Sequence, residues 1–288
     1  MSMDTSPTQS PLVTIAILTW NRRVEVARAV QSALSQTYRP IEVLVVDSAS
    51  ADGTADFLEE RFSAVKVVRL HRNLGCPEGR NIAFANSKGT YIYCLDDDGW
   101  IPPDTVGKCI DIFSMDARIG VVTCKILAPI ERNSTQGIQK AVRLFNGGAS
   151  MIRRDVLDRA GYYPSDFVRQ AEESYLALQV IDRGFKIVYT DDAVMFHEPS
   201  PNNRNIGQFI YYGCRNDLVT IVRLYPWYLI PFFVMQKYWS WILNGIRQFQ
   251  VFPVLHAFVS FLGMLPESLR LRRPVTLAAI KESYRLRR

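Results

Sequence analysis

Apolar runs alternate with amphipathic stretches through the first hundred residues of the chain. Apolar runs bounded by turn residues predict buried strands over residues 13–18, 41–46, 65–70 and 91–95. Between these runs, apolar residues recur at intervals of three and four, which predicts helices over 24–34, 54–62 and 77–87. Regular alternation of strand and helix predicts a doubly wound α/β fold with a mostly parallel sheet.

The pattern is less regular between residues 105 and 200. Apolar runs predict strands over 120–127, 142–145 and 185–190, and helical spacing predicts helices over 153–160 and 167–181. Gly147 and Gly148 form a stretch where a ligand can approach the backbone closely. We assign residues 12–200 to one α/β domain and expect the polar residues 1–11 to be disordered.

The last third of the chain, residues 201–288, has a different character. Its apolar, aromatic-rich segments predict helices over 209–224, 227–235, 238–243 and 251–265. None of these segments reaches the roughly 18–20 unbroken apolar residues of a membrane span. Their mixture of Trp, Tyr and Phe with Lys and Arg is typical of helices that lie in the headgroup layer of a membrane. The alternatives are that these helices close over the α/β core or pair between subunits.

The charge of the chain is divided unevenly. Residues 201–288 carry 12 Lys and Arg against 3 acids, whereas residues 1–200 carry 22 against 25. Near an anionic membrane, basic residues such as Arg270, Arg272 and Arg273 would each add about 1 kcal/mol of binding free energy. Nucleic acid is not an expected partner, because these residues follow an apolar region and do not line a reading helix. Five scattered cysteines without a C-x-x-C motif indicate a reducing cytosol.

Three consecutive carboxylates, Asp96, Asp97 and Asp98, follow the strand predicted over 91–95. Open α/β sheets bind ligands at this end of their strands. Adjacent carboxylates repel one another, so a cation is expected, and oxygen ligands favour Mg²⁺ or Mn²⁺, which in turn suits a diphosphate. The alternative is a solvated acidic turn. Neither G-x-G-x-x-G nor a P-loop motif follows the first strand, so strand-end side chains and a metal would hold any nucleotide.

Six segments, in order and spacing, resemble the family 2 glycosyltransferases, whose fold is termed GT-A. They are T-I-A-I-L-T-W-N-R (14–22), V-V-D-S-A-S-A-D-G-T (45–54), N-L-G-C-P-E-G-R-N (73–81), L-D-D-D (95–98), A-E-E-S-Y-L-A-L (171–178) and His197. The resemblance implies a nucleotide-binding half over 12–104, an acceptor half over 105–200 and a C-terminal helical, amphipathic extension over 201–288. Within this family, the chain most resembles bacterial rhamnosyltransferase-like enzymes that build surface polysaccharides.

The resemblance also implies roles for individual residues on the donor side. Thr19 and Trp20 match positions that line the base pocket. Asp47 matches a carboxylate that contacts the base or ribose, and the alternative is a turn or capping residue. Arg80 would lie near the nucleotide, or form a salt bridge to Asp47 or to the acid triplet.

Metal and acceptor contacts follow in the same way. Asp96 and Asp97 would face ribose and metal-bound water, and Asp98 would ligate the metal. His197 matches a metal or phosphate contact in some relatives, with a satisfied structural histidine as the alternative. Gly147 and Gly148 would border the acceptor.

The general base is expected at Glu173, with Glu172 as the second candidate. Relatives usually carry Glu-Asp here, and many have an Asp where this chain has Tyr175. With a reference pKa of about 4.3, a glutamate is ionised at neutral pH, as a base must be. It would take the proton of an acceptor hydroxyl that attacks in line, which inverts the sugar carbon. The alternative is a pair of acids placed in a helix's first turn by the macrodipole.

These observations predict a metal-dependent, inverting glycosyltransferase that moves one sugar from a nucleoside-diphosphate donor to a glycan or lipid-linked acceptor. We expect it to be cytoplasmic and peripheral on the inner face of the cell membrane. One alternative is a sugar nucleotidyltransferase, which would be expected to have a Gly-rich loop after the first strand. The other is a non-catalytic carbohydrate- or membrane-binding relative that has lost its base.

Overall fold

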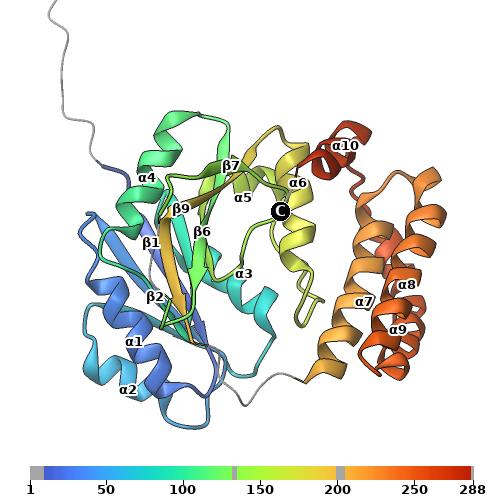
Figure 1. Cartoon of the computed structure of the whole chain (residues 1–288). Helices are drawn as coiled ribbons and strands as arrows, with labels where there is room; N and C mark the ends of the chain where they lie inside the picture. Colours follow the sequence, from blue (N-terminus) through green and yellow to red (C-terminus); the bar gives the residue numbers. More distant parts are fainter. Residues whose placement is uncertain (1–9, 132–134, 199–204, 287–288) are drawn as a thin grey trace, which may run out of the picture.

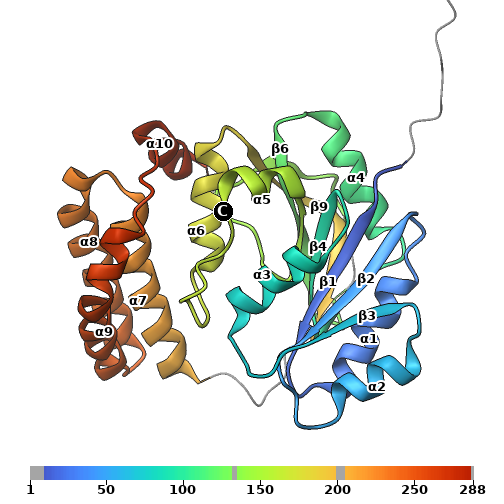
Figure 2. The same cartoon turned by 180° about the vertical axis from the view of Figure 1, so that it is seen from behind.

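A computed structural model describes residues 10–131, 135–198 and 205–286 (Figure 1). Most of the segment predicted to be disordered, residues 1–11, lies outside this part of the chain, as do Arg287 and Arg288. An α/β unit with a twisted central sheet is followed by a separate block of C-terminal helices, and both views show this division (Figures 1 and 2).

The central sheet is mixed, with strand order β3-β2-β1-β4-β8-β6-β9-β5. Its parallel half consists of β1 (Val13–Thr19), β2 (Ile41–Asp47), β3 (Val65–Arg69) and β4 (Tyr91–Asp96). In the other half, β8 (Ala149–Arg153) runs antiparallel to β4 and β6 (Ile119–Leu127), and β9 (Lys186–His197) runs parallel to β6. Two short strands, β5 (Gly99–Trp100) and β7 (Gln139–Ala141), pair antiparallel with β9.

Helices cover both faces of this sheet, as the alternating pattern predicts. On one face, the core packs against α1 (Arg23–Leu34), α2 (Thr54–Arg61) and α4 (Thr105–Met115). On the other face, it packs against α3 (Cys76–Asn86), α5 (Arg154–Ala160) and α6 (Glu172–Asp182). Residues of β4 contribute to both clusters, so this strand is buried on both sides and brings its carboxyl end into the interior of the domain.

The structure differs from the sequence-based prediction mainly in the second half of the domain. The strand predicted over 142–145 lies earlier, at β7, and β8 and α4 were not predicted. The helix predicted from residue 167 begins only at Glu172, because Gln170 and Ala171 adopt φ values of 70° and 68°, which interrupt a right-handed helix. The strand predicted over 185–190 continues to His197.

Four α-helices follow in the described residues: α7 (Ile206–Leu224), α8 (Ile230–Arg247), α9 (Val251–Arg270) and α10 (Leu277–Arg285). Helices α7, α8 and α9 share a small apolar core, and α10 packs against the α6 side of the α/β domain. Residues 230–235 of the first predicted segment and all of the segment predicted over 238–243 form one α-helix, because Pro231 falls in its first turn, where no intrahelical N–H is needed. Trp227–Leu229 form a short 3₁₀ helix before it.

Helix α9 is longer than the apolar segment predicted from the sequence. Over 18 of its residues the mean hydropathy is 1.3, and 22% of that stretch is buried, so length and composition alone would allow it to cross a membrane. The helix is not an unbroken apolar run, since His256 and Ser260 interrupt it, so the sequence-based criterion did not select it. A single helix that passes this test is weak evidence of a membrane span.

Candidate active site

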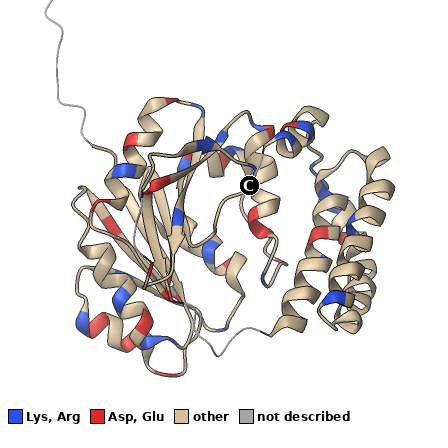
Figure 3. Ribbon diagram, in the orientation of Figure 1, with Lys and Arg blue, Asp and Glu red and all other residues tan. Residues whose placement is uncertain are grey.

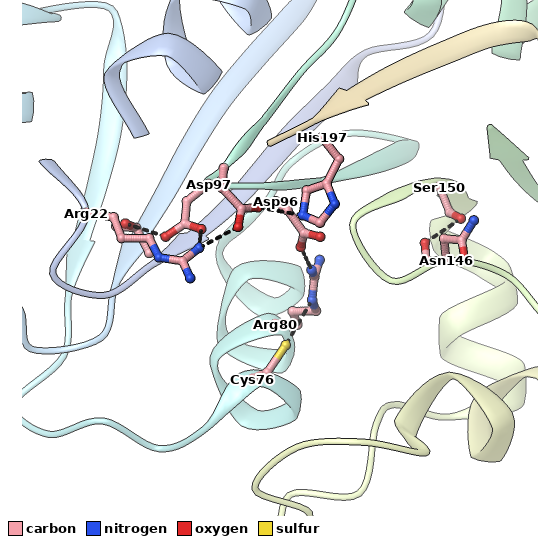
Figure 4. A network of polar contacts seen from close by, with 10 residues as sticks. Arg22, Cys76, Arg80, Asp96, Asp97, Asn146, Ser150 and His197 are labelled. Atoms are coloured by element: carbon pink, nitrogen blue, oxygen red, sulfur yellow. Dashed lines mark hydrogen bonds and ion pairs between the residues drawn. The ribbon is translucent and has the colours of Figure 1, made fainter. Parts of the chain in front are cut away.

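The acid triplet lies where β1 and β4 end side by side. Leu18 pairs with Asp96 in the parallel register, so the residues after both strands emerge at the same edge. There the Thr19 hydroxyl donates to Asp97 Oδ2 at 2.9 Å. At the end of β9, His197 Nε2 lies 3.0 Å from Asp98 Oδ1 (Figure 4). The prediction that the triplet sits at a buried strand end is confirmed, since Asp97 and Asp98 are buried.

A basic residue that the sequence analysis did not single out completes this cluster. Arg22, in the loop after β1, donates from one guanidinium nitrogen to Asp97 Oδ1 at 2.7 Å and to Asp98 Oδ2 at 2.8 Å. Burial raises the pKa of Asp97 to about 6, although the Arg22 charge opposes this shift. Burial also acts on Asp98, but the His197 hydrogen bond and the Arg22 charge outweigh it, and its pKa is lowered. A basic residue three positions after a strand-end threonine was the available signal.

Asp96 is paired with a second buried guanidinium. The Arg80 Nη2 of α3 donates to Asp96 Oδ1 at 2.6 Å, and Arg80 Nε approaches Cys76 Sγ at 3.4 Å (Figure 4). This is the salt bridge to the acid triplet anticipated for Arg80. Opposite it, a Cβ at Gly148 would lie 1.9 Å from Asp96 Oδ2. Only glycine fits there, so Gly148 makes room for the carboxylate.

The chemistry of these side chains fits a divalent cation. One ligand atom from each of Asp96, Asp98 and His197 can be grouped within 4.8 Å of the others. The two guanidinium groups of Arg22 and Arg80 balance two of the three triplet carboxylates, which leaves one negative charge. An additional cation is therefore favoured electrostatically, and two carboxylates with one imidazole form a suitable ligand set.

A cleft of about 600 Å³ opens beside the triplet. Thr19, Trp20 and Arg80 line it together with all three aspartates and His197. The Trp20 side chain is exposed, so its ring is available for stacking on a planar ligand. Asp47 is buried, is not among the lining residues in the described part of the chain, and accepts hydrogen bonds from the Ser50 backbone N–H and hydroxyl. Its observed environment is that of a turn residue, and ligand contact stays a prediction.

A second cleft, of about 680 Å³, holds Glu173, Gly147 and Gly148. The Gly147 N–H donates to Glu173, and a Cβ at Gly147 would lie 2.3 Å from Glu173 Oε1. Gly147 thus leaves room for the Glu173 carboxylate, and Gly148 leaves room for that of Asp96. The sequence analysis had explained the two glycines only by the close approach of a ligand.

The two glutamates at the start of α6 face different clefts. Glu172 lines the first cleft, and its buried Oε2 has no hydrogen-bond partner among the described residues. Burial and the neighbouring Glu173 raise the pKa of Glu172 to about 8. Burial also raises the pKa of Glu173, but backbone N–H groups and the Arg80 charge oppose that shift. The expectation that a glutamate here ionises without tuning is therefore wrong, because burial raises the pKa of both.

The two clefts meet. Both are lined by Cys76, Arg80, Asp96 and Gln170, so the acid triplet and Glu173 face one continuous space. The junction is closed on one side by Gly75, where a Cβ would lie 2.4 Å from the Val168 carbonyl oxygen. The adjacent Cys76 N–H donates to that same oxygen at 3.0 Å. This contact joins the start of α3 to the segment that precedes α6.

Comparison with solved structures identifies the fold. The fold matches that of the Staphylococcus aureus enzyme TarS (residues 1–349, in complex with UDP-GlcNAc), with a TM-score of 0.62, 19% identity, and coverage of 90% of this chain and 83% of that one. The mannosyltransferase PcManGT from Pyrobaculum calidifontis, in complex with GDP-Man and Mn²⁺, matches with a TM-score of 0.61 and 19% identity over 96% and 84% of the two chains. The fold is thus the GT-A fold of glycosyltransferases.

Comparison of sequences identifies the family of the chain. Residues 14–164 match the profile of "Glycosyl transferase family 2", and the chain belongs to this family. Chondroitin synthase of Escherichia coli is 36% identical over 114 residues, which are 39% of this chain and 17% of that protein. The E. coli glucosyltransferase WfaP, named for action on a GlcNAc-diphosphoundecaprenol, is 37% identical over 92 residues, or 31% and 37% of the two chains. The matched segments therefore span well under half of these relatives.

Proposed function

We propose that this protein is a metal-dependent, inverting glycosyltransferase that moves a single sugar from a nucleoside-diphosphate sugar to a hydroxyl acceptor. The observation that carries the proposal is the junction of the two clefts at Asp96 and Arg80, with the acid triplet on one side and Glu173 on the other. We assign the donor side to residues 12–104, the acceptor side to 105–200 and a helical extension to 201–288.

On the donor side, the base would stack against Trp20 beside Thr19, and Asp96, Asp97 and Arg80 would hold the ribose and phosphates. A direct contact from Asp47 would require its Ser50 hydrogen bonds to open. TarS and PcManGT, whose structures contain UDP-GlcNAc and GDP-Man, support a nucleotide sugar as donor. Their likeness to this chain is in fold, so the base and sugar are to be determined by assay.

Asp98, His197 and Asp96 would hold the metal, for which Mn²⁺ is favoured over Mg²⁺, because an imidazole nitrogen suits the harder magnesium ion less well. A bound divalent ion supplies Lewis-acid stabilisation of the negative charge that develops on the leaving diphosphate. Arg22 and Arg80 add positive charge to the same region.

On the acceptor side, Glu173 would take the proton of the attacking hydroxyl. The new bond forms between that oxygen and the anomeric carbon as the bond from this carbon to the diphosphate oxygen breaks, and the configuration inverts. Glu172 has a pKa of about 8, so it is mostly protonated and neutral at pH 7. It therefore places no negative charge beside Glu173 that would oppose the ionisation of Glu173.

We further propose that the acceptor is a glycan or lipid-linked glycan of cell-surface polysaccharide or glycolipid synthesis, reached from the cytoplasmic face of the membrane. The name of WfaP includes such a lipid-linked acceptor. Helices α8 and α9 support peripheral attachment, because large apolar side chains on them are exposed, and few Lys, Arg, Asp or Glu residues are coloured along their ribbons in Figure 3.

The test is a screen of the full-length protein against UDP-, GDP- and TDP-sugars, with and without Mn²⁺, for release of nucleoside diphosphate. We expect Mn²⁺-stimulated hydrolysis of one donor class, and loss of this activity in Asp98→Asn with an unchanged melting temperature. Turnover that is equal in Asp98→Asn would remove the metal from the mechanism. Formation of pyrophosphate from a sugar phosphate and a nucleoside triphosphate would instead indicate a nucleotidyltransferase, and no turnover of any donor would indicate a non-catalytic relative.

A further inference from the structure

A third cavity, of about 170 Å³, lies where the C-terminal helices meet the acceptor half of the catalytic domain. The segment between β7 and β8 contributes Arg143 and Leu144, α6 contributes Ser174, α7 contributes Thr220, and α8 contributes Lys237. The proposed mechanism uses none of these residues.

The charges in this cavity are incompletely balanced. Arg143 has no hydrogen bond or ion pair within the described part of the chain. Lys237 Nζ lies 3.5 Å from Asp217 Oδ2, and that oxygen also accepts a hydrogen bond from Trp241 Nε1 at 2.9 Å. One carboxylate thus faces two cations, which leaves a net positive charge in the cavity.

An unsatisfied hydroxyl gives a second, independent indication of a ligand. Thr220 is 7% exposed, it lines the cavity, and its Oγ1 has no hydrogen-bond partner among the described residues. A buried hydroxyl without a partner is costly, because it has lost its hydrogen bonds to water. Together with the guanidinium of Arg143 and the ammonium of Lys237, it forms a set of donors suited to a small oxyanion.

The location of the cavity indicates which anion would bind there. It shares Leu144 and Ser174 with the Glu173 cleft, and Ser174 follows Glu173 in the chain. On its other side, Phe233 of α8 lines it, next in sequence to the exposed Phe232. An anion bound here would lie between the proposed base and the apolar surface of the C-terminal helices.

We propose that this cavity binds a phosphate group of the acceptor, and that the acceptor is a sugar joined through a phosphate or diphosphate to a prenyl chain. The sugar hydroxyl would then reach Glu173, the phosphate would contact Arg143 and Lys237, and the apolar chain would leave along α8. This inference rests on the proposed function, since it assigns an acceptor to a glycosyltransferase. It gives the C-terminal helices a direct part in substrate selection.

The test uses farnesyl diphosphate as a water-soluble probe, titrated calorimetrically into the full-length protein in EDTA. Inorganic pyrophosphate and farnesol are the comparison ligands. We expect farnesyl diphosphate to bind most tightly, and Arg143→Gln or Lys237→Gln to weaken it about tenfold, the effect of one charge-assisted hydrogen bond of about 1.4 kcal/mol. Arg247→Gln, also on α8 but outside the cavity, is the matched control and should bind as the unmodified protein does.

Arg22→Gln shows whether the probe binds in the donor cleft instead. An affinity reduced by Arg22→Gln but not by Arg143→Gln would overturn the inference, as would pyrophosphate binding as tightly as farnesyl diphosphate, or no binding of the prenyl probe. Donor hydrolysis with Mn²⁺, measured on the same preparations, separates the two proposals. If the unmodified protein hydrolyses a donor but Arg143→Gln and Lys237→Gln leave probe binding unchanged, only the acceptor subsite is wrong. If it hydrolyses no donor, the proposed function is wrong whatever the probe does.

Discussion

The α/β domain and the C-terminal helices use apolar residues in opposite ways. Six of the seven residues of β1 are buried, whereas Gly245 is the single buried residue of α8. Phe232, Trp239 and Phe252 are 64%, 61% and 77% exposed. Burial in the first region makes the strand ends rigid enough to hold adjacent charges in fixed pairs. In the second region the apolar side chains stay in contact with water in the folded chain. Covering them with a partner surface would therefore be favourable.

The largest expected effect is on catalysis, and it comes from a substitution in the α/β domain. Glu173→Gln should reduce sugar transfer by about 10²–10⁴-fold, the usual contribution of a general base. Glu172→Gln should retain most of the activity, because Glu172 is expected to be mostly neutral at pH 7. Initial rates of nucleotide release in the presence of acceptor give both values. Equal losses in the two variants would mean that the pair acts as a unit, and a selective loss in Glu172→Gln would reverse the assignment.

A backbone substitution tests how tightly the acid cluster is packed. Gly148→Ala places a methyl group 1.9 Å from Asp96 Oδ2, so that carboxylate must move away from Arg80. We expect about 10²-fold slower transfer, the penalty for displacing a reacting group by about 1 Å. Gly107→Ala on α4, where no atom lies within 4 Å, is the matched control. Comparable rates for the two alanine variants would contradict the described geometry.

A smaller effect is expected on stability. The pKa of Glu172 is raised from 4.5 to about 8 in the folded protein, so the unfolded chain releases this proton first as the pH rises. The stability associated with the neutral carboxyl is complete below about pH 4.5 and is lost as the pH rises toward 8. Glu172→Gln cannot ionise, so relative to the unmodified protein it should gain about 1.4 kcal/mol of stability for each pH unit crossed in this window. Denaturant melts at pH 4 and pH 8.5 measure the gain, and parallel pH profiles would rule out the shift.

The smallest effect belongs to the exposed helices. Phe232→Ser combined with Phe252→Ser should weaken binding to vesicles of phosphatidylglycerol and phosphatidylcholine about tenfold, because two large apolar groups no longer insert. Ile130→Ser, at a still more exposed position in the α/β domain, should have no effect on binding. Co-sedimentation measures both. If the two proteins bind alike, the exposed faces of α8 and α9 have another partner, and a change in oligomeric state would indicate a second copy of the chain.

Much of the first half of the fold could be predicted because each element there has its own periodic signal. The four parallel strands were predicted to within a residue at each end, since each is a short apolar run bounded by turn residues. Helix α4 has Val106, Cys109 and Phe113 at helical spacing, and this available signal was overlooked. Strand β8 follows Gly147-Gly148 and is only five residues long, so nothing local separates it from a loop. Its partners β4 and β6 define it as a strand.

Which residues form the candidate site could be predicted from the sequence, but not which charged side chains pair with each other. Asp96 and Asp98 were found because three adjacent acids at a strand end are unusual. That Arg22 pairs with Asp97 and Asp98, and that Arg80 pairs with Asp96, depends on the directions of long side chains, which spacing does not determine. The raised pKa of Glu172 likewise follows from burial, which a reference value omits.

The contact of Gly75 and Cys76 with the Val168 carbonyl has a mechanical consequence. It fastens the start of α3, the helix that carries Arg80, to the irregular segment that leads through two left-handed residues to Glu173. A shift of either segment must be followed by the other or must break this bond. The pocket proposed to hold the leaving diphosphate and the side chain proposed to activate the acceptor hydroxyl would thus move together, through a glycine outside both proposed contacts.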